Sequence, residues 1–178
     1  MKHKLASWLL LFVAMSWGLA FVTMKDALGR QSVNSFLFYR FAVATFALLI
    51  IHPKILKKLN WDIIKHGGIT GAFLGAGFIT QTYGLDWTGA AITGFITGLY
   101  VVATPLFEQF FGGQKLGKNV WLSIAIATVG LGLLSIHGLT IGLGEFLVLI
   151  SAICYTGQII GLSKWSAGRD LWALAWVQ

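Results

Sequence analysis

Six runs of 18 to 20 residues dominate this 178-residue chain, and Arg40 is the one charged residue that falls within them. The runs are Leu5–Met24, Val33–Ile51, Gly67–Leu85, Thr88–Phe107, Asn119–Ile136 and Phe146–Ser163, and a seventh begins at Leu171. An α-helix of about 20 apolar residues crosses the hydrocarbon core of a bilayer. The runs are continuous rather than alternating, which favours helices over transmembrane strands. We therefore expect an all-α fold, a polytopic bundle of membrane-spanning helices.

The composition argues against other classes of protein. Charged residues make up 11% of the chain, whereas a soluble domain carries about 25%. The net charge of +7 lies in basic clusters between the runs, so we expect the lipid bilayer, and not nucleic acid, as the partner. Cys154 is the lone cysteine, which predicts neither a disulfide nor a metal site. The four histidines are scattered at the ends of the runs, which disfavours an enzyme, and no cofactor is expected.

The basic residues also predict the orientation of the chain. If the N-terminus lies inside, ten lysine and arginine residues fall in inner segments and two, Lys25 and Arg30, in outer loops. Basic residues concentrate on the cytoplasmic side of membrane proteins, so we expect a cytoplasmic N-terminus. The longest polar stretch, His52 to His66, is then expected to lie at the inner interface as a short amphipathic segment. Lys25, Asp26 and Glu145 flank outer ends of spans, where we expect water to hydrate them.

Small residues four apart allow helix backbones to approach closely, and three runs contain them. The stripes are Gly67, Gly71 and Gly75; Ala90, Gly94 and Gly98; and Gly157 and Gly161. They predict tight helix contacts, and they would also allow helices to slide or rock during transport. Pro105 removes a backbone hydrogen bond near the inner end of the fourth run. It predicts a kink there, or a hinge that gates the inner mouth.

A weak internal repeat appears at an offset of 138 residues. It places Tyr155 on Trp17 and Gln178 on Arg40. The first copy would contain five spans, and an odd number makes the second copy start on the opposite side of the membrane. Inverted repeats of this kind build many secondary transporters, with the substrate site between the halves near the midplane.

Five stretches follow one another along the chain in a recognisable order. They are Trp17–Lys25 (WGxxFxxxK), Phe38–Phe41 followed by Ala44 (RFxxA), Ala90–Ala91 with Leu99–Phe107 (a helix ending in a proline), Gly130–Leu134 (glycine-rich) and Gly144–Leu147. This series resembles the first five helices and the start of the second repeat in EamA-type proteins of the drug/metabolite transporter superfamily. One departure is that Gly112–Lys115 lacks the acidic residue often found there in the family.

The resemblance implies ten helices in two five-helix inverted repeats, of which residues 5–136 would be the first and residues 144–178 the truncated start of the second. It implies export or import of a small-molecule solute, a small metabolite, by alternating access, in the bacterial inner (plasma) membrane. A non-transporting scaffold and a truncated inactive fragment remain the alternatives, and a homodimer stays open. Neither the solute nor the coupling can be read from the chain.

Arg40 is the strongest candidate for a site residue, because a charge within the hydrocarbon region is costly unless it is paired or hydrated. We expect it to face a polar cavity, where it orients helices or binds an anionic group; the alternative is a bond to backbone carbonyls. Trp17 lies deep in the first run and would wall that cavity or fill the core. Uncharged polar residues at membrane depth are the further candidates for the substrate path, or else bond between helices: Tyr39, Gln81, Tyr100, Thr104 and Gln158.

Overall fold

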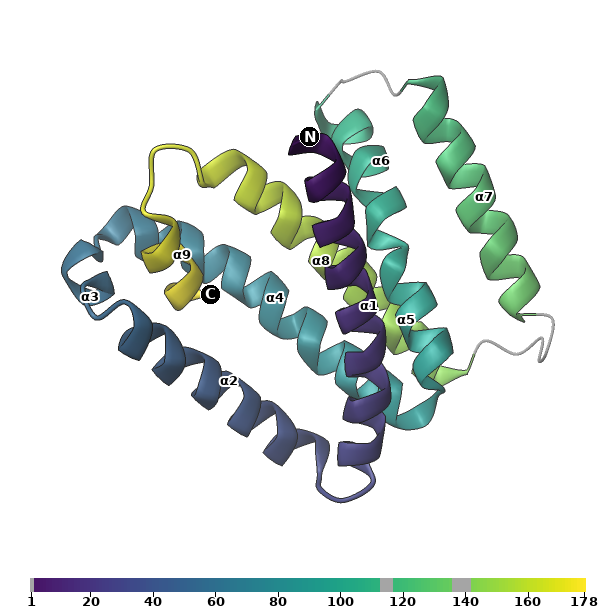
Figure 1. The fold of residues 1–178 in the computed structure, drawn as a ribbon, viewed down its shortest axis with the longest axis horizontal. Helices are drawn as coiled ribbons and strands as arrows, with labels where there is room; N and C mark the ends of the chain where they lie inside the picture. The colour runs from purple at the N-terminus through teal and green to yellow at the C-terminus, as the bar shows by residue number, and fades with distance from the viewer. Residues whose placement is uncertain (1, 113–116, 136–141) are drawn as a thin grey trace.

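The computed structural model describes residues 2–112, 117–135 and 142–178, and in these residues every regular element is an α-helix. The helices are α1 (Lys2–Leu28), α2 (Val33–Ile51), α3 (Ile55–Lys58), α4 (Trp61–Trp87), α5 (Ala90–Gly98), α6 (Tyr100–Gly112), α7 (Lys118–Ser135), α8 (Leu143–Trp165) and α9 (Leu171–Val177) (Figure 1). The prediction of an all-α helix bundle is confirmed.

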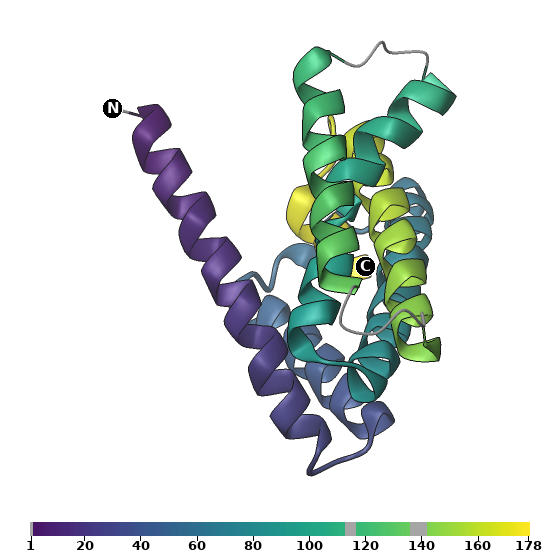
Figure 2. The ribbon, with the colours of Figure 1, turned by 90° about the vertical axis from the view of Figure 1, so that its right-hand side faces the viewer.

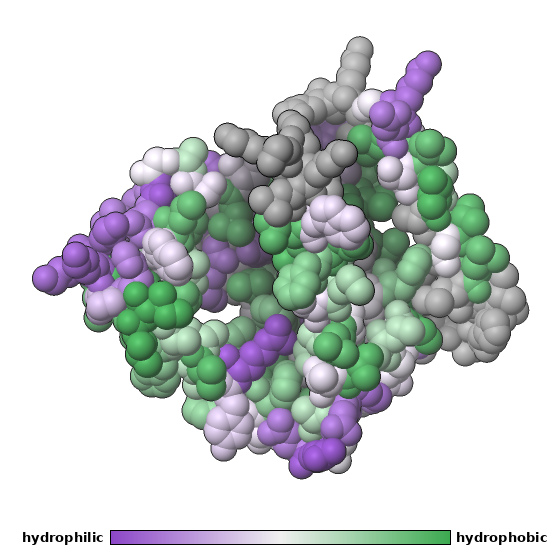
Figure 3. Space-filling view, in the orientation of Figure 1, coloured by the Kyte–Doolittle hydropathy of each residue, from purple (hydrophilic) through white to green (hydrophobic). Residues whose placement is uncertain are grey.

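Among the described residues, five of the six predicted runs each lie on one helix, and the fourth is divided between α5 and α6. Four stretches of the described residues are long and apolar enough to cross a membrane: Leu11–Leu28, Val33–Ile51, Ala90–Phe110 and Leu143–Trp165. The third expected span lies in α4, which is long enough but carries many glycine, threonine and other polar residues. The fifth lies in α7, where side chains are described only in part. Hydrophilic residues gather around α3 and around the α1–α2 connection at the opposite end, with apolar residues between them (Figure 3).

Helices α4 and α8 form the centre of the bundle and share its most extensive helix contact. Glycines make this contact close: a Cβ atom added at Gly84 would lie 2.7 Å from the Gly144 carbonyl oxygen, and one at Gly77 would lie 2.7 Å from the Tyr155 ring. Gly157 likewise faces Phe73, at 2.9 Å. Without a hydrophobic driving force between helices in lipid, such close backbone packing holds a bundle together.

The predicted glycine stripes are only partly contact surfaces. A Cβ at Gly67 would meet Val177, and one at Gly71 would meet Gln178, so these two residues pack against α9 and its end. A Cβ at Gly75 would have nothing within 4 Å, and the same holds for Gly98. At Gly94 a Cβ would lie 3.3 Å from the Phe21 ring on α1. The stripe on α4 therefore contacts α9 and its end through Gly67 and Gly71. Gly77 and Gly84, outside the stripe, make the closer contact with α8.

Helix α1 leans away from the other helices towards its N-terminus and joins the bundle through its C-terminal half (Figure 2). There the Lys25 ammonium donates hydrogen bonds to the carbonyl oxygens of Leu85 (2.8 Å) and Asp86 (2.6 Å). These carbonyls end α4, and a cation near a helix C-terminus is favourable. Glu145 accepts a hydrogen bond from Thr88 at the same end. Lys25 and Glu145 are thus partly exposed but also bond within the protein, which the sequence did not predict.

The polar stretch from His52 to His66 contains one short helix of its own, α3. Trp61 already begins α4, where the Asn60 side chain accepts from the Ile63 amide and caps the helix. Ile55 on α3 is fully buried and packs with Ile63 and Ala173. The segment therefore packs against α9, and its place at the inner membrane interface stays a prediction.

The fourth predicted span is interrupted at Leu99, which separates α5 from α6. The Leu99 amide donates to the Ile96 carbonyl three residues back, at 3.1 Å, which tightens the last turn of α5. Pro105, where a kink was expected, lies inside α6, six residues further on. The break thus follows Gly98, and the hinge roles of Gly98 and Pro105 stay predictions.

Candidate functional site

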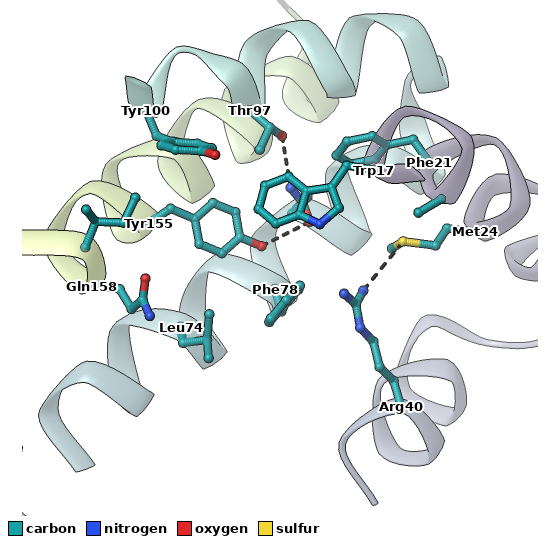
Figure 4. Close-up of a pocket in the computed structure, with 13 residues that line it drawn as sticks. Trp17, Phe21, Met24, Arg40, Leu74, Phe78, Thr97, Tyr100, Tyr155 and Gln158 are labelled. Carbon is teal, nitrogen blue, oxygen red and sulfur yellow. Dashed lines mark hydrogen bonds between the residues drawn. The ribbon is translucent and has the colours of Figure 1, made fainter. Parts of the chain in front are cut away.

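A cavity of about 310 Å³ lies between α1, α2, α4, the α5–α6 break and α8 (Figure 4). Ligand pockets in proteins have volumes of about 300–1,000 Å³, so the cavity suits a small molecule. Thirteen residues line it: Trp17, Ala20, Phe21, Met24, Arg40, Leu74, Phe78, Gln81, Thr97, Tyr100, Tyr155, Gln158 and Ile159.

Five of the seven predicted substrate-path residues line this cavity: Trp17, Arg40, Gln81, Tyr100 and Gln158. Tyr39 does not. Its side chain is 62% exposed and its ring contacts Phe38. Consecutive helix residues point about 100° apart, so Tyr39 and Arg40 face different surroundings. Thr104 also lies outside the lining, and its hydroxyl donates to the Tyr100 carbonyl at 2.7 Å.

Arg40 places its guanidinium 4.1 Å from the centre of the Phe78 ring, within the range of a cation–π contact. Its Nη1 atom donates to the Met24 sulfur at 3.5 Å, and a thioether is a weak acceptor. None of the ion pairs in the described part of the chain involves Arg40, and none of its described hydrogen bonds goes to a backbone carbonyl. Its charge is therefore held by an aromatic face and a sulfur atom, without a counter-ion.

A chain of hydrogen bonds crosses the cavity floor and joins α4, α5 and α8. Gln81, which is 4% exposed, donates from Nε2 to the Thr97 hydroxyl at 2.9 Å and accepts from the Tyr155 hydroxyl at 3.0 Å. Gln158 donates to the Gln178 side chain at 3.2 Å. These amides fulfil the expected alternative role, bonding between helices, while they also face the cavity.

Aromatic rings form most of the remaining wall. The Phe78 ring packs edge-to-face against Tyr155, with centroids 5.6 Å apart, and Tyr100 packs against Tyr155 in the same way at 6.4 Å. Figure 4 shows Trp17 over the centre of the cavity, with Arg40 and Gln158 on opposite sides. Among the described residues, no group of three or more His, Cys, Asp or Glu side chains could hold a metal ion.

Sequence reasoning missed Tyr155, Thr97 and Phe78 as lining residues. The internal repeat contained a signal for Tyr155, because it pairs this residue with Trp17. Applied to the whole lining, the offset of 138 gives three pairs that all face the cavity: Trp17 with Tyr155, Ala20 with Gln158, and Phe21 with Ile159. Corresponding faces of α1 and α8 thus meet at one cavity.

The apolar helices and this cavity define an integral membrane protein of the transporter class. The sequence model of the EamA-like transporter family matches residues 4–136. The chain belongs to this family, whose members are transporters rather than enzymes. It is also 32% identical, over 157 residues, to an uncharacterized transporter from Archaeoglobus fulgidus. That match covers 88% of this chain and 48% of the relative, so the chain spans about half the relative's length. No solved structure matches the chain.

Proposed function

We propose that the chain supplies the first repeat, residues 5–136, and the opening of the second, residues 144–178, of an inverted-repeat transporter. It would carry a small organic solute across the plasma membrane by alternating access, through the cavity of Figure 4. The observation that carries the proposal is the set of three lining pairs related by the repeat offset. A substrate site between two inverted repeats, near the midplane, is the arrangement of many secondary transporters.

The surroundings of the lining residues support this proposal. Arg40 and Gln81 are polar side chains that a lipid-facing surface would not tolerate, and both face the cavity. The cavity also lies beside the α5–α6 break and is walled on one side by α1, which contacts the bundle through only half of its length. Both features are points where helices can shift relative to each other. Gly98, Gly94 and Pro105 would serve as hinge or sliding positions there.

Alternating access predicts that water reaches the cavity from either side of the membrane, in different conformations. The test uses Ala20→Cys in a Cys154→Ser background, with a membrane-impermeant maleimide added to right-side-out and inside-out vesicles. We expect labelling in both preparations. Val43→Cys is the matched control. Val43 lies in the membrane span of α2, is exposed on the surface of the molecule and does not line the cavity. We expect lipid to cover it, so it should stay unlabelled. Labelling of Ala20→Cys from only one side under every condition would contradict alternating access.

Flux is measured separately, on proteoliposomes that contain either the 178-residue chain or the complete reading frame that includes it. A panel of carboxylates, amines, sugars and nucleobases is assayed for saturable uptake. At least one solute should be taken up, with a rate that falls in Gln81→Leu and is unchanged in Arg30→Gln, an exposed outer residue paired with Asp26. If a folded, inserted protein moves none of them, the scaffold alternative would hold instead.

A further inference from the structure

The charge of the cavity wall indicates the chemical class of the solute, an inference that rests on the proposed transport function. We propose that the cavity binds an organic anion with an apolar, planar body, its anionic group at Arg40 and its body against Phe78, Trp17 and Tyr155.

Arg40 brings a permanent positive charge to the cavity, and none of the ion pairs formed by the described residues includes it. A guanidinium has five N–H donors and no acceptor, and the described contacts of Arg40 are one weak sulfur acceptor and one ring face. In surroundings of low dielectric, an unpaired charge is costly. A carboxylate or similar group would accept two parallel hydrogen bonds from the guanidinium fork and balance its charge. A ligand cation would instead meet a like charge inside the cavity.

Most of the other polar side chains that face the cavity are already bonded within the protein. The Gln81 amide is held between Thr97 and Tyr155, and Gln158 is bonded to Gln178. The Tyr100 hydroxyl also lines the cavity, as a neutral group. Arg40 is therefore the charged group of the described lining, and this favours a solute with one anionic group.

The rest of the wall suits an apolar, flat body. Phe78 and Tyr155 meet edge-to-face, and both line the cavity. Trp17 lies across this space, and Arg40 lies to one side of it (Figure 4). Aromatic groups favour offset-stacked or edge-to-face contacts with such rings. A solute whose anionic group lies at Arg40 would extend along Phe78 towards Tyr155.

The test compares three probes of the same shape that differ in charge: 3-phenylpropionate, 3-phenylpropanamide and 3-phenylpropylammonium. Their binding to the purified 178-residue chain in lipid nanodiscs is measured by isothermal titration calorimetry. We expect the carboxylate to bind at least about tenfold more tightly than the amide, equivalent to about 1.4 kcal/mol, and the ammonium to bind most weakly. This comparison needs no variant, so it does not depend on how a substitution folds.

Variants then assign the preference to Arg40. Arg40→Gln should make the carboxylate and the amide bind alike, while Arg40→Lys should keep a reduced preference for the carboxylate. Arg30→Gln removes the same charge from an exposed outer site and should keep the full preference. Equal binding of the three probes, absence of binding by all of them, tighter binding of the ammonium, or an unchanged preference in Arg40→Gln would overturn the inference.

Flux of the same probes separates this inference from the proposed function. If the carboxylate binds through Arg40 but is not carried into proteoliposomes by the complete protein, and no panel solute is carried either, the transport proposal fails while the anion site stands. If a panel solute is carried but the carboxylate shows no preference over the amide, the anion inference fails and the transport proposal stands.

Discussion

Gly84 is where the backbones of α4 and α8 leave least room for a side chain. A Cβ there would lie 2.5 Å from a methyl carbon of Val148 and 2.7 Å from the Gly144 carbonyl oxygen, and a backbone atom cannot move aside without shifting α8. We expect Gly84→Ala to destabilise the protein by about 1–3 kcal/mol, as overpacking does elsewhere. The change would appear as a lower midpoint of thermal unfolding in detergent micelles.

Gly75→Ala is the matched control on the same helix, since a Cβ at Gly75 meets nothing within 4 Å. Alanine also favours a helix over glycine by about 0.5–1 kcal/mol, so this variant should be as stable as the wild type or slightly more stable. Equal loss of stability in the two variants would contradict the assignment of the tight contact to Gly84.

Lys25 is a second residue whose role is local and measurable. Its two hydrogen bonds to carbonyls at the end of α4 involve a charged donor, and such bonds are stronger than neutral ones. Lys25→Met should destabilise by about 1–2 kcal/mol and speed hydrogen exchange of the Thr88 amide, which bonds to Gly84 at that helix end. Lys25→Arg keeps the donors and should recover most of the stability. A Met variant as stable as the Arg variant would show that the bonds contribute nothing.

At the residue scale, the sequence identified site residues by the type of their side chain, but not by the direction in which the side chain points. Arg40 and Gln81 could be selected because charged and amide groups are costly in lipid, whichever way they point. Tyr39 was selected by the same reasoning, but its direction depends on helix rotation, which polarity alone does not reveal. Phe78 and Thr97 could not be selected, since aromatic and small polar residues occur throughout the chain.

At the scale of elements, charged side chains join the ends of the helices that lie near α3. Arg169, in the connection between α8 and α9, donates to both carboxylate oxygens of Asp62 at the start of α4, and Lys58 on α3 pairs with Asp170. Asp170 also caps α9 by accepting from the Ala173 amide at 3.0 Å. Two pairs of opposite charge therefore join α3 and the start of α4 to the α8–α9 connection and the start of α9.

The pH dependence of this contact follows from Asp62. The hydrogen bond from Arg169 holds the pKa of the Asp62 carboxyl below its usual value. A carboxyl whose pKa is lower in the folded state than in the unfolded state stabilises the fold above its unfolded pKa, about 3.9. The contribution is lost as the pH falls through the folded pKa. We therefore expect Asp62→Asn to melt at a lower temperature than the wild type at pH 7, and the difference to shrink below about pH 4 and to disappear below the folded pKa.

Asp26→Asn serves as the control for this measurement, because Asp26 forms an exposed ion pair with Arg30 at the opposite end of the molecule. Exposed pairs contribute little to stability, so this variant should follow the wild-type curve of melting temperature against pH. A difference between Asp62→Asn and wild type that is constant from pH 3 to pH 7 would rule out the linkage to Asp62.

Helices were easier to predict than the contacts between them. The lengths of the apolar runs determine that α1, α2 and α8 exist, since a span needs a minimum length. The break at Leu99 was not predicted, because neither Gly98 nor Leu99 differs in type from residues inside unbroken helices. The glycine stripe of α4 predicted a tight contact, which Gly67 and Gly71 make with α9 and its end, but it did not reveal the face that meets α8. Thr70, Gly77 and Gly84 repeat every seven residues and are all buried, and this spacing, rather than four, marks the side that meets α8.

At the scale of the whole molecule, the internal repeat and the cavity support the same interpretation. The offset of 138 residues is weak as a sequence signal, yet three pairs that it defines line one cavity. The chain spans about half the length of the relative from Archaeoglobus fulgidus, so solute flux and a homodimer stay proposals.

The orientation of the chain is the prediction that applies to the molecule as a whole, and it follows from the ten basic residues assigned to inner segments against two in outer loops. Gln31, between α1 and α2, should face the outside, and Lys57, on α3, the cytoplasm; both are exposed. In a Cys154→Ser background, a membrane-impermeant maleimide should label Gln31→Cys in intact cells and Lys57→Cys only after permeabilisation. The opposite pattern would invert every loop assignment and place the Asp62–Arg169 contact on the outer face.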